Sequence, residues 1–301
     1  MESKSADVKG SSPESDRVEA AETAPGAEKE VAPAMKSLRV SLSVLDVFSD
    51  GPRDWGVNEI AQKCGLSKSH ASKVLAAFAD TGFLVRDPVS KRYSVGVRLY
   101  AIGQRYVAHD RLTQSAIPLM RQLVDETRHS ARLSVLDGDR MLYLMGVEGP
   151  LSSASGWRSG MWLPVHSTAA GQCMLAFMDK AEARRLLSGK LERTTEKTLT
   201  DPAAIEKVLA QARRRGWVGA RGENILEVGA IAVPVFGERQ RLLGALSLSF
   251  PARTVKVAQE PALAGMLHQA AALLSQRVGC ELYPFSTFAT HHGRLKSSVD
   301  E

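Results

Sequence analysis

Residues 57–78 read VNEIAQKCGLSKSHASKVLAAF, and this stretch decides the fold of the first half of the chain. Ile60 and Ala61 fall on the apolar face of a short helix that Gly65 ends. Ser67 is then placed to cap a second helix after a tight turn. The apolar stripe of this second helix consists of Ala71, Val74, Leu75 and Phe78. The stretch therefore predicts two short helices joined by a tight turn.

The flanking residues extend this pair of helices into a larger unit. A helical pattern of leucines starts near Lys36 and stops at the turn 49–52. Beyond the second helix, the strand-like runs 83–86 and 92–95 flank a polar turn, which indicates a hairpin. The order helix, helix, tight turn, helix, hairpin predicts a winged helix-turn-helix domain over residues 36–96.

Such a domain places the helix after the tight turn in the major groove of DNA and its hairpin on phosphates or in the minor groove. Short hydrogen-bonding and cationic side chains occupy the start of that helix, namely Ser67, Lys68, Ser69, His70, Ser72 and Lys73. The hairpin adds Arg86, Lys91 and Arg92. A charged helix face can also be merely solvated. The tight turn, the cap, the apolar stripes and the basic hairpin together favour DNA binding over that alternative.

The charge distribution supports the same interpretation more weakly. The chain of 301 residues has a net charge of +6 and a pI near 9.3, which suggests an anionic partner. Residues 1–35 hold four Lys or Arg against eight Asp or Glu, with no aromatic residue, and this predicts a disordered acidic tail. Residues 36–110 hold eleven against seven. The positions of the cations, rather than the overall pI, carry the prediction.

The second half mixes helical and strand-like segments. We expect a helical linker over 97–111, a second domain over 112–280 and a polar C-terminal tail over 281–301. Helices are predicted from Ile117, with Pro118 in the first turn, over 167–178, from Pro202 to Arg215 and over 262–278, and strands over 131–136, 141–147, 231–236 and 242–250. Strands in hairpins with helices segregated around them indicate an α+β fold.

Several motifs stand in one order along both halves: VNEIA (57–61), GLSKS (65–69), GFLV (82–85), YSVGVRL (93–99), LPVHSTAAG (163–171), IAVPV (231–235) and LSLSFP (246–251). Together they resemble the IclR family of transcription regulators over residues 36–279. The resemblance implies a winged helix-turn-helix joined by a helical linker to a GAF-like α/β effector-binding domain with an antiparallel sheet. It also implies a homodimer or a dimer of dimers, that is, a tetramer. Its partners would be double-stranded operator DNA and a small-molecule effector that controls a repressor or activator.

Two features of the second half suit a ligand independently of the resemblance. Ser247 and Ser249 point to the same side of an otherwise apolar strand. Buried hydroxyls need partners, which the neighbouring backbone or a ligand can supply. The segment STAAG, residues 167–171, opens a helix with small residues. Its unpaired backbone N–H groups favour an anion, although an ordinary N-cap on a tightly packed helix has the same sequence.

The resemblance implies an effector pocket around these two features. It implicates Ala169, Ala170, Ser247 and Ser249, then Ala230 from a neighbouring strand and Ser152 and Trp157 from the preceding segment. The chain departs from the family at Gln172, where Lys is frequent, and near Ala220, where some members hold an acidic residue. Arg221 and a helix N-terminus both suit a carboxylate, so we expect a small organic acid. Trp157 and Trp162 admit an aromatic acid, although both could equally be core or dimer contacts.

Two other functions stay open. A redox-sensing regulator would use Cys64 or Cys173 as its switch, although Cys173 lies among apolar residues typical of a buried thiol. An enzyme domain fused to a DNA-binding module would need a placed nucleophile, and His166 has no such partner in any motif. His291 and His292 lack companions at metal-ligand spacing. We therefore expect no catalytic residue, no metal site and no cofactor.

Cellular location follows from two further observations. The three cysteines are scattered, which is typical of a reducing compartment. No apolar run reaches the length of a membrane-spanning helix, and the N-terminus lacks the apolar core of a secretory signal. We expect a cytoplasmic protein with no membrane partner.

Overall fold

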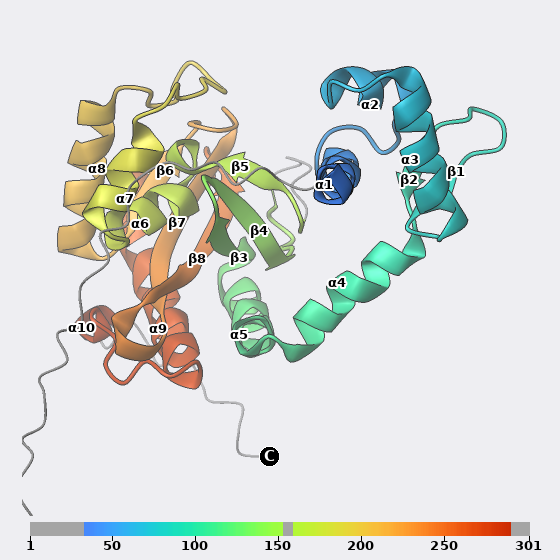
Figure 1. Ribbon diagram of the computed structural model, residues 1–301. Coiled ribbons are helices and arrows are strands. Elements are labelled where there is room, and N and C mark those ends of the chain that lie inside the picture. Colours follow the sequence, from blue (N-terminus) through green and yellow to red (C-terminus); the bar gives the residue numbers. More distant parts are fainter. Residues whose placement is uncertain (1–32, 153–158, 290–301) are drawn as a thin grey trace, which may run out of the picture.

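The computed structural model describes residues 33–152 and 159–289. Figure 1 shows two domains joined by helix α4 (Val97–His109). The N-terminal domain contains α1 (Pro33–Asp46), the short helix η1 (Val47–Ser49), α2 (Val57–Lys63), α3 (Lys68–Asp80), β1 (Leu84–Arg86) and β2 (Tyr93–Val95). The predicted winged helix-turn-helix is thus confirmed. Helix α1 begins inside the segment expected to be an acidic tail, and residues 1–32 lie outside the described residues.

A small apolar core holds the N-terminal domain together. Ile60 of α2, Leu75 of α3 and Leu84 of β1 are buried in one cluster, and each of these elements is too short to be stable alone. Trp55 and Tyr93 exchange backbone hydrogen bonds of 2.8 and 2.9 Å. This exchange fixes the segment before α2 against β2, so the wing and the helix pair form one unit.

The second domain is built on one antiparallel sheet of six strands in the order β5-β4-β3-β8-β7-β6. Its strands are β3 (Ser130–Asp137), β4 (Arg140–Val147), β5 (Trp162–Pro164), β6 (Val218–Arg221), β7 (Val228–Phe236) and β8 (Leu242–Pro251). Its helices are α5 (Arg111–Thr127), α6 (Ala169–Phe177), α7 (Lys180–Leu187), α8 (Pro202–Arg215), α9 (Glu260–Arg277) and α10 (Ser286–Ala289). The short helices η2 (Val165–Ser167), η3 (Glu238–Gln240) and η4 (Val257–Gln259) connect them. The α+β prediction is confirmed.

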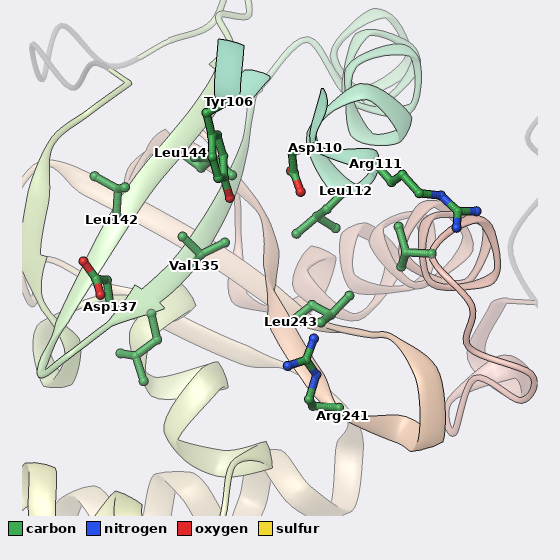
Figure 2. A pocket seen from close by; sticks show the side chains of 12 residues that line it. Tyr106, Asp110, Arg111, Leu112, Val135, Asp137, Leu142, Leu144, Arg241 and Leu243 are labelled. Carbon is green, nitrogen blue, oxygen red and sulfur yellow. The ribbon is translucent and has the colours of Figure 1, made fainter. Parts of the chain in front are cut away.

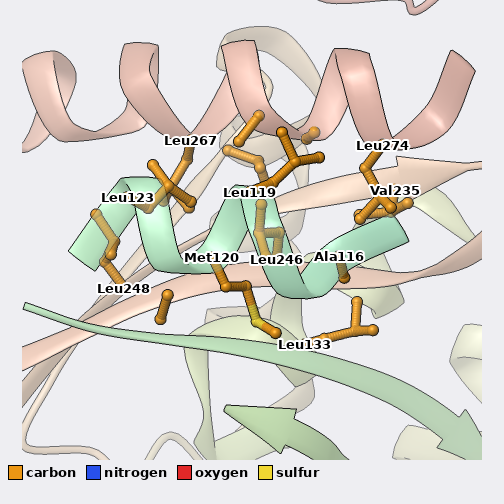
Figure 3. Packing of buried hydrophobic residues seen from close by; sticks show 14 of the residues in the cluster. Ala116, Leu119, Met120, Leu123, Leu133, Val235, Leu246, Leu248, Leu267 and Leu274 are labelled. Atoms are coloured by element: carbon orange, nitrogen blue, oxygen red, sulfur yellow. The ribbon is translucent and has the colours of Figure 1, made fainter. Parts of the chain in front are cut away.

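Helices cover both faces of this sheet. Figure 3 shows α5 and α9 packed on one face, where large aliphatic side chains interdigitate: Leu119, Met120, Leu123, Leu133, Leu246, Leu248, Leu267 and Leu274. Helices α6 and α8 pack on the other face against smaller strand residues, Ala220, Ala232 and Ala245. Successive side chains of a strand point to opposite faces of the sheet. Ala245 therefore faces α6 and α8, and the next residue, Leu246, faces α5 and α9.

The sheet register places polar residues in the small-residue layer. Ser247 of β8 pairs with Arg132 of β3 on one side and with Ala232 of β7 on the other. Two residues further along β8, Ser249 pairs with Ala230. Small side chains on this face leave space beneath the start of α6, which is where the candidate pocket lies.

Pro118 lies differently from its predicted position. Helix α5 begins at Arg111 after the capping residue Asp110, so Pro118 stands inside the helix rather than in its first turn. A proline inside a helix removes one backbone hydrogen bond. The buried stripe that starts at Leu112 continues past the proline, and its packing against the sheet compensates for that lost bond.

The C-terminal segment also differs from the expected polar tail. Tyr283 is buried, and its hydroxyl donates to the Pro234 carbonyl across 3.0 Å and lies 2.9 Å from Nδ1 of His268. The Phe285 ring packs edge-on against Phe177, with 5.3 Å between centroids. Residues 281–289 therefore belong to the second domain, and residues 290–301 lie outside the described residues.

Candidate functional site

The exposed start of α3 carries the residues predicted to contact DNA. The Ser67 hydroxyl accepts from the backbone N–H of His70 across 3.2 Å and caps the helix. Ala71 and Leu75 are buried against the domain core, which turns the opposite face outward. The predicted contact residues are all exposed in the N-terminal part of this helix: Ser67, Lys68, Ser69, His70, Ser72 and Lys73. The surface presents cations and small hydrogen-bonding groups from one helix, as major-groove recognition requires.

The wing is a rigid turn with two cations at its surface. Oδ1 of Asp87 accepts from the backbone N–H groups of Val89 and Ser90, at 3.0 and 2.6 Å. Lys91 has a φ of 59° and donates from Nζ to the Pro88 carbonyl across 2.6 Å. Arg86 is exposed beside the Tyr93 ring. Arg86 and Lys91 thus remain on the surface that the sequence predicts for the wing.

Arg92 does not join them. Its guanidinium donates to Asp54 and, across 2.8 Å, to Oε2 of Glu59. The backbone N–H of Gly56 and the Arg92 guanidinium hold the pKa of Glu59 below its usual value. Arg92 therefore ties the wing to the start of α2, and its prediction as a DNA contact is corrected to a structural role.

A small pocket lies between the start of α6 and the sheet in the second domain. Its lining combines the helix start with β4, β6, β7 and β8: Tyr143, Ser167, Thr168, Ala169, Ala170, Ala220, Glu223, Asn224, Ile225, Val228, Ala230 and Ser247. The cavity has a volume of about 20 Å³, which is room for about one water molecule. Four of the predicted effector residues, Ala169, Ala170, Ala230 and Ser247, meet around it.

The start of α6 packs tightly against the preceding turn. The Thr168 hydroxyl accepts from the Gly171 N–H across 3.0 Å. A side chain at Gly171 would meet the Val165 carbonyl oxygen at 2.0 Å, so only glycine allows α6 to approach the preceding turn this closely. Ala169 and Ala170, the first two residues of α6, line the cavity at the positive end of the helix.

Sequence reasoning missed Glu223, the acidic group of the pocket. Nε2 of Gln172 donates to Oε2 of Glu223 across 2.5 Å and to the His166 carbonyl across 2.8 Å. Burial raises the pKa of Glu223 to about 7. Gln172 was noted only as a departure from the family. A polar side chain within an apolar helix needs a hydrogen-bond partner, and Gln172 is such a side chain. This need is the one signal in the sequence that could have pointed to Glu223.

Other predicted effector residues lie elsewhere. Ser249 is buried on the same face of the sheet but outside the present lining. Ser152 is exposed and away from the pocket, and Trp157 lies outside the described residues. Arg221 points to the opposite face from Ala220, because neighbours on a strand alternate. Its Nε donates to Oε1 of Glu260 across 2.6 Å, so its prediction as an effector contact is corrected.

The groups behind the rival functions have ordinary structural surroundings. Burial raises the pKa of the Cys173 thiol well above its usual value and also raises the pKa of Cys64, which disfavours the reactive thiolate. Nε2 of His166 lies 2.9 Å from the Glu192 carbonyl. Across residues 33–152 and 159–289, no group of three or more His, Cys, Asp or Glu is placed to hold a metal ion. None of the helices in this described part combines the length and apolar character needed to cross a bilayer.

A larger groove of about 640 Å³ opens where α4 meets α5 (Figure 2). Its walls are Leu112, Val135, Leu142, Leu144 and Leu243, with Tyr106, Asp110, Arg111, Asp137 and Arg241 around them. It contains none of the predicted effector residues. The smaller pocket is lined by hydroxyl and carboxyl residues and by the start of a helix, whereas the groove is an open and mainly aliphatic surface.

Comparison with known proteins gives the same division of the chain. Residues 37–88 match the family described as IclR helix-turn-helix domain, and residues 104–276 match the family described as Bacterial transcriptional regulator IclR C-terminal. The chain is 32% identical to the HTH-type transcriptional regulator XynR of Escherichia coli (strain K12), covering 82% of this chain and 98% of that protein. It is 31% identical to the HTH-type transcriptional regulator KdgR of the same organism, covering 81% and 95%.

Solved structures agree with these relatives. An IclR transcriptional regulator from Alicyclobacillus acidocaldarius superimposes with a TM-score of 0.74 at 28% identity, covering 81% of this chain and 99% of that one. An IclR homolog from Microbacterium hydrocarbonoxydans, complexed with 4-hydroxybenzoate, gives a TM-score of 0.70 at 26% identity, covering 80% and 98%.

Proposed function

The chain belongs to the IclR family of bacterial transcriptional regulators, and on this premise we propose that a small organic acid bound in the α6 pocket controls its affinity for operator DNA. The chain is a DNA-binding regulator and not an enzyme. One observation carries the proposal: Ala169 and Ala170 at the start of α6, Glu223 and Ser247 line one cavity. The Ser247 hydroxyl donates to the Arg132 carbonyl across 3.5 Å, a long bond that a ligand could replace. We place its action in the cytoplasm, where bacterial operators lie.

The small cavity suggests how a ligand produces a response. At about 20 Å³ the pocket cannot hold even a small acid. An acid therefore binds a more open form of the domain, and its preference for that form shifts the population toward it. Helix α4 continues almost directly into α5, so movement of α5 or the sheet can reach the DNA-binding domain through α4.

We expect the protein to bind its operator as a dimer. Helix α4 has no buried residue. Four of its large apolar or aromatic side chains are more than half exposed: Val97, Tyr100, Ile102 and Tyr106. Leu38 and Leu42 of α1 are likewise exposed by half. Large apolar side chains on two helices that remain unburied in a single chain support contact with a second copy. A homodimer, or a dimer of dimers, would place two α3 helices on two half-sites of the operator.

The test measures DNA binding and ligand binding on the same protein. DNA selected from a random pool by the full-length chain supplies the operator, and fluorescence anisotropy follows its affinity with and without each organic acid. An acid at 100 times its dissociation constant should stabilise the fold by about 2.7 kcal/mol and change operator affinity. An acid that stabilises the fold without altering operator affinity would contradict the proposed coupling.

A further inference from the structure

Arg132 is a buried cation on the pocket side of the sheet. It lies on β3 directly opposite Ser247, which lines the pocket, and only 5% of the residue is exposed. Its guanidinium carbon is 5.7 Å from the ring centroid of Tyr143, another lining residue. The residue therefore adjoins the pocket from the side of β3 and β4, although its side chain is not part of the present lining.

The guanidinium has fewer partners than its burial demands. Its Nη2 pairs with Oε1 of Glu148 across 2.7 Å, but the buried Nε finds no hydrogen-bond partner in the described structure. Glu148 itself is more than half exposed and also accepts from the Ser130 hydroxyl across 2.9 Å. A buried donor left unpaired is unfavourable. The arrangement suits a site whose second acceptor is supplied from outside the chain.

The surrounding backbone makes room for this side chain. A Cβ at Gly146, opposite Arg132 on β4, would lie 2.6 Å from its Nη1. Glycine at this position therefore leaves room for the guanidinium beside β4. Arg221, the arginine that the sequence suggested for the effector, lies on the opposite face of the sheet, and its three guanidinium nitrogens donate to Glu260 and two backbone carbonyls.

We propose that Arg132 is the anion-binding residue of the pocket, and that it selects effectors carrying a single carboxylate. This inference rests on the proposed function, because it assigns the chemistry of the same pocket. When the pocket opens, a carboxylate can accept from Nε and Nη of Arg132 in the two-pronged geometry that guanidinium groups favour. The other end of the ligand would meet the apolar walls at Ile225 and Val228.

The charge of the pocket disfavours effectors with more than one negative charge. Glu223 lies in the same lining, and its carboxylate, when ionised, repels each anionic group on the ligand, so a second charge without its own cationic partner adds to the cost. A dicarboxylate or a phosphate monoester therefore fits less well than a monocarboxylate. An aliphatic or aromatic body is compatible with the Tyr143, Ile225 and Val228 side chains.

The experiment compares acids with their neutral isosteres on the full-length protein by isothermal titration calorimetry. The probes are pyruvate, benzoate and 4-hydroxybenzoate, the corresponding amides, and phenyl phosphate. The variants are Arg132→Gln, Glu148→Gln and, as a control for surface charge, Arg121→Gln on the exposed side of α5. Circular dichroism checks that each variant folds.

At least one monocarboxylate should bind the wild type in preference to its amide and to phenyl phosphate. Arg132→Gln should weaken that acid about 10- to 100-fold, the value of a charged hydrogen bond, and leave amide binding unchanged. Glu148→Gln should tighten acid binding, because it removes the carboxylate that competes for Arg132. It also keeps the inference testable if Arg132→Gln does not fold. Arg121→Gln should change nothing.

Equal acid affinity in Arg132→Gln and wild type would overturn the role of Arg132, as would unchanged or weaker binding in Glu148→Gln. Wild-type protein that binds amides as tightly as acids, or binds none of the acids at millimolar concentration, would overturn the carboxylate assignment. The variant Ser247→Leu separates these results from failure of the proposed function. An acid that binds Ser247→Leu as tightly as wild type occupies some other site, and then the pocket itself is wrong.

Discussion

Arg221 donates from Nε to Oε1 of Glu260 across 2.6 Å, which joins β6 to the first turn of α9. Its Nη1 and Nη2 donate to the carbonyls of Ala252 and Val255 at 2.7 and 2.8 Å. The Glu260 side chain is only 9% exposed. Each nitrogen of the Arg221 guanidinium therefore donates to the fold, and the residue holds the loop between β8 and α9 in place.

Arg221→Gln should therefore reduce stability and leave effector affinity unchanged. Removing one partner of a largely buried ion pair leaves the other charge without compensation. We expect a loss of about 2–4 kcal/mol in the free energy of unfolding, measured by urea denaturation. Calorimetry with benzoate should give the wild-type dissociation constant. A variant of wild-type stability that binds acids more weakly would return Arg221 to the pocket.

Lys68 and Lys73 should contribute to operator affinity through α3. Both are exposed, Lys68 in the first turn of the helix and Lys73 on the face away from the buried Ala71 and Leu75. The double change to alanine should weaken operator binding, and the slope of log affinity against log salt should fall by about one for each lysine that contacts a phosphate. The matched control is Lys180→Ala with Lys256→Ala, two exposed lysines of the second domain. Unchanged affinity and slope would remove α3 from the interface.

The wing offers a comparison between neighbouring arginines. Arg86 and Lys91 are exposed on the surface of the wing and form no ion pair with any residue that the structure describes, whereas Arg92 is held by Asp54 and Glu59. Changing Arg86 and Lys91 to alanine should weaken DNA binding and leave the melting temperature near that of the wild type. Arg92→Ala should instead lower the melting temperature of the DNA-binding domain. If Arg92→Ala weakens DNA binding at unchanged stability, the structural assignment of Arg92 fails.

The sequence was sufficient for features that a local pattern encodes. The Ser67 cap, the stripe through Leu75 and the alternation along β8 each depend on periodicity within one element, and each is found as predicted. Arg221 was misassigned although the same alternation, applied to β6 from Ala220, places it on the far face. The alternation applies only once a strand has been recognised. Strands β5 and β6 have three and four residues, which is too short for the sequence to reveal them.

Long-range partners explain the remaining differences. In the sequence Arg92 has the position of a wing cation. In the folded domain it pairs with Asp54 and Glu59, which lie more than 30 residues earlier in the chain. Tyr283 reads as part of a polar tail because Pro234, the acceptor of its hydroxyl, is 49 positions away. Arg132 shows the same limit for function. Its burial and its unpaired Nε depend on the packing of β3 between β4 and β8, and no spacing in the sequence reports them.

Ser247 should be the residue whose enlargement blocks the pocket. It lines a cavity of about 20 Å³, so a leucine there occupies the space that a ligand must enter. Ser247→Leu should abolish stabilisation by organic acids while operator binding persists, at a cost of about 1–3 kcal/mol for overpacking. Ser249→Leu is the matched control, since Ser249 is buried on the same strand face outside the lining. A normal ligand response from Ser247→Leu would exclude this pocket.

Glu223 should make both stability and ligand binding depend on pH near neutrality. Burial raises its pKa to about 7 from a usual value of 4.5. Between these values the folded protein holds a proton that the unfolded chain has released. Its stabilising contribution is therefore fully present below the unfolded pKa and is lost as pH rises through 7. The difference corresponds to at most about 3 kcal/mol.

The isosteric change Glu223→Gln tests this, because the amide oxygen can still accept from Nε2 of Gln172. Urea denaturation of both proteins from about pH 5 to about pH 8 should show the variant gaining stability relative to wild type as pH rises. Buried His268, whose pKa is lowered to about 4, destabilises both proteins equally as pH falls, so the comparison cancels it. Benzoate should bind wild type more weakly as Glu223 ionises and should bind the variant without that loss. Parallel pH profiles for the two proteins would show that Glu223 does not titrate in this range.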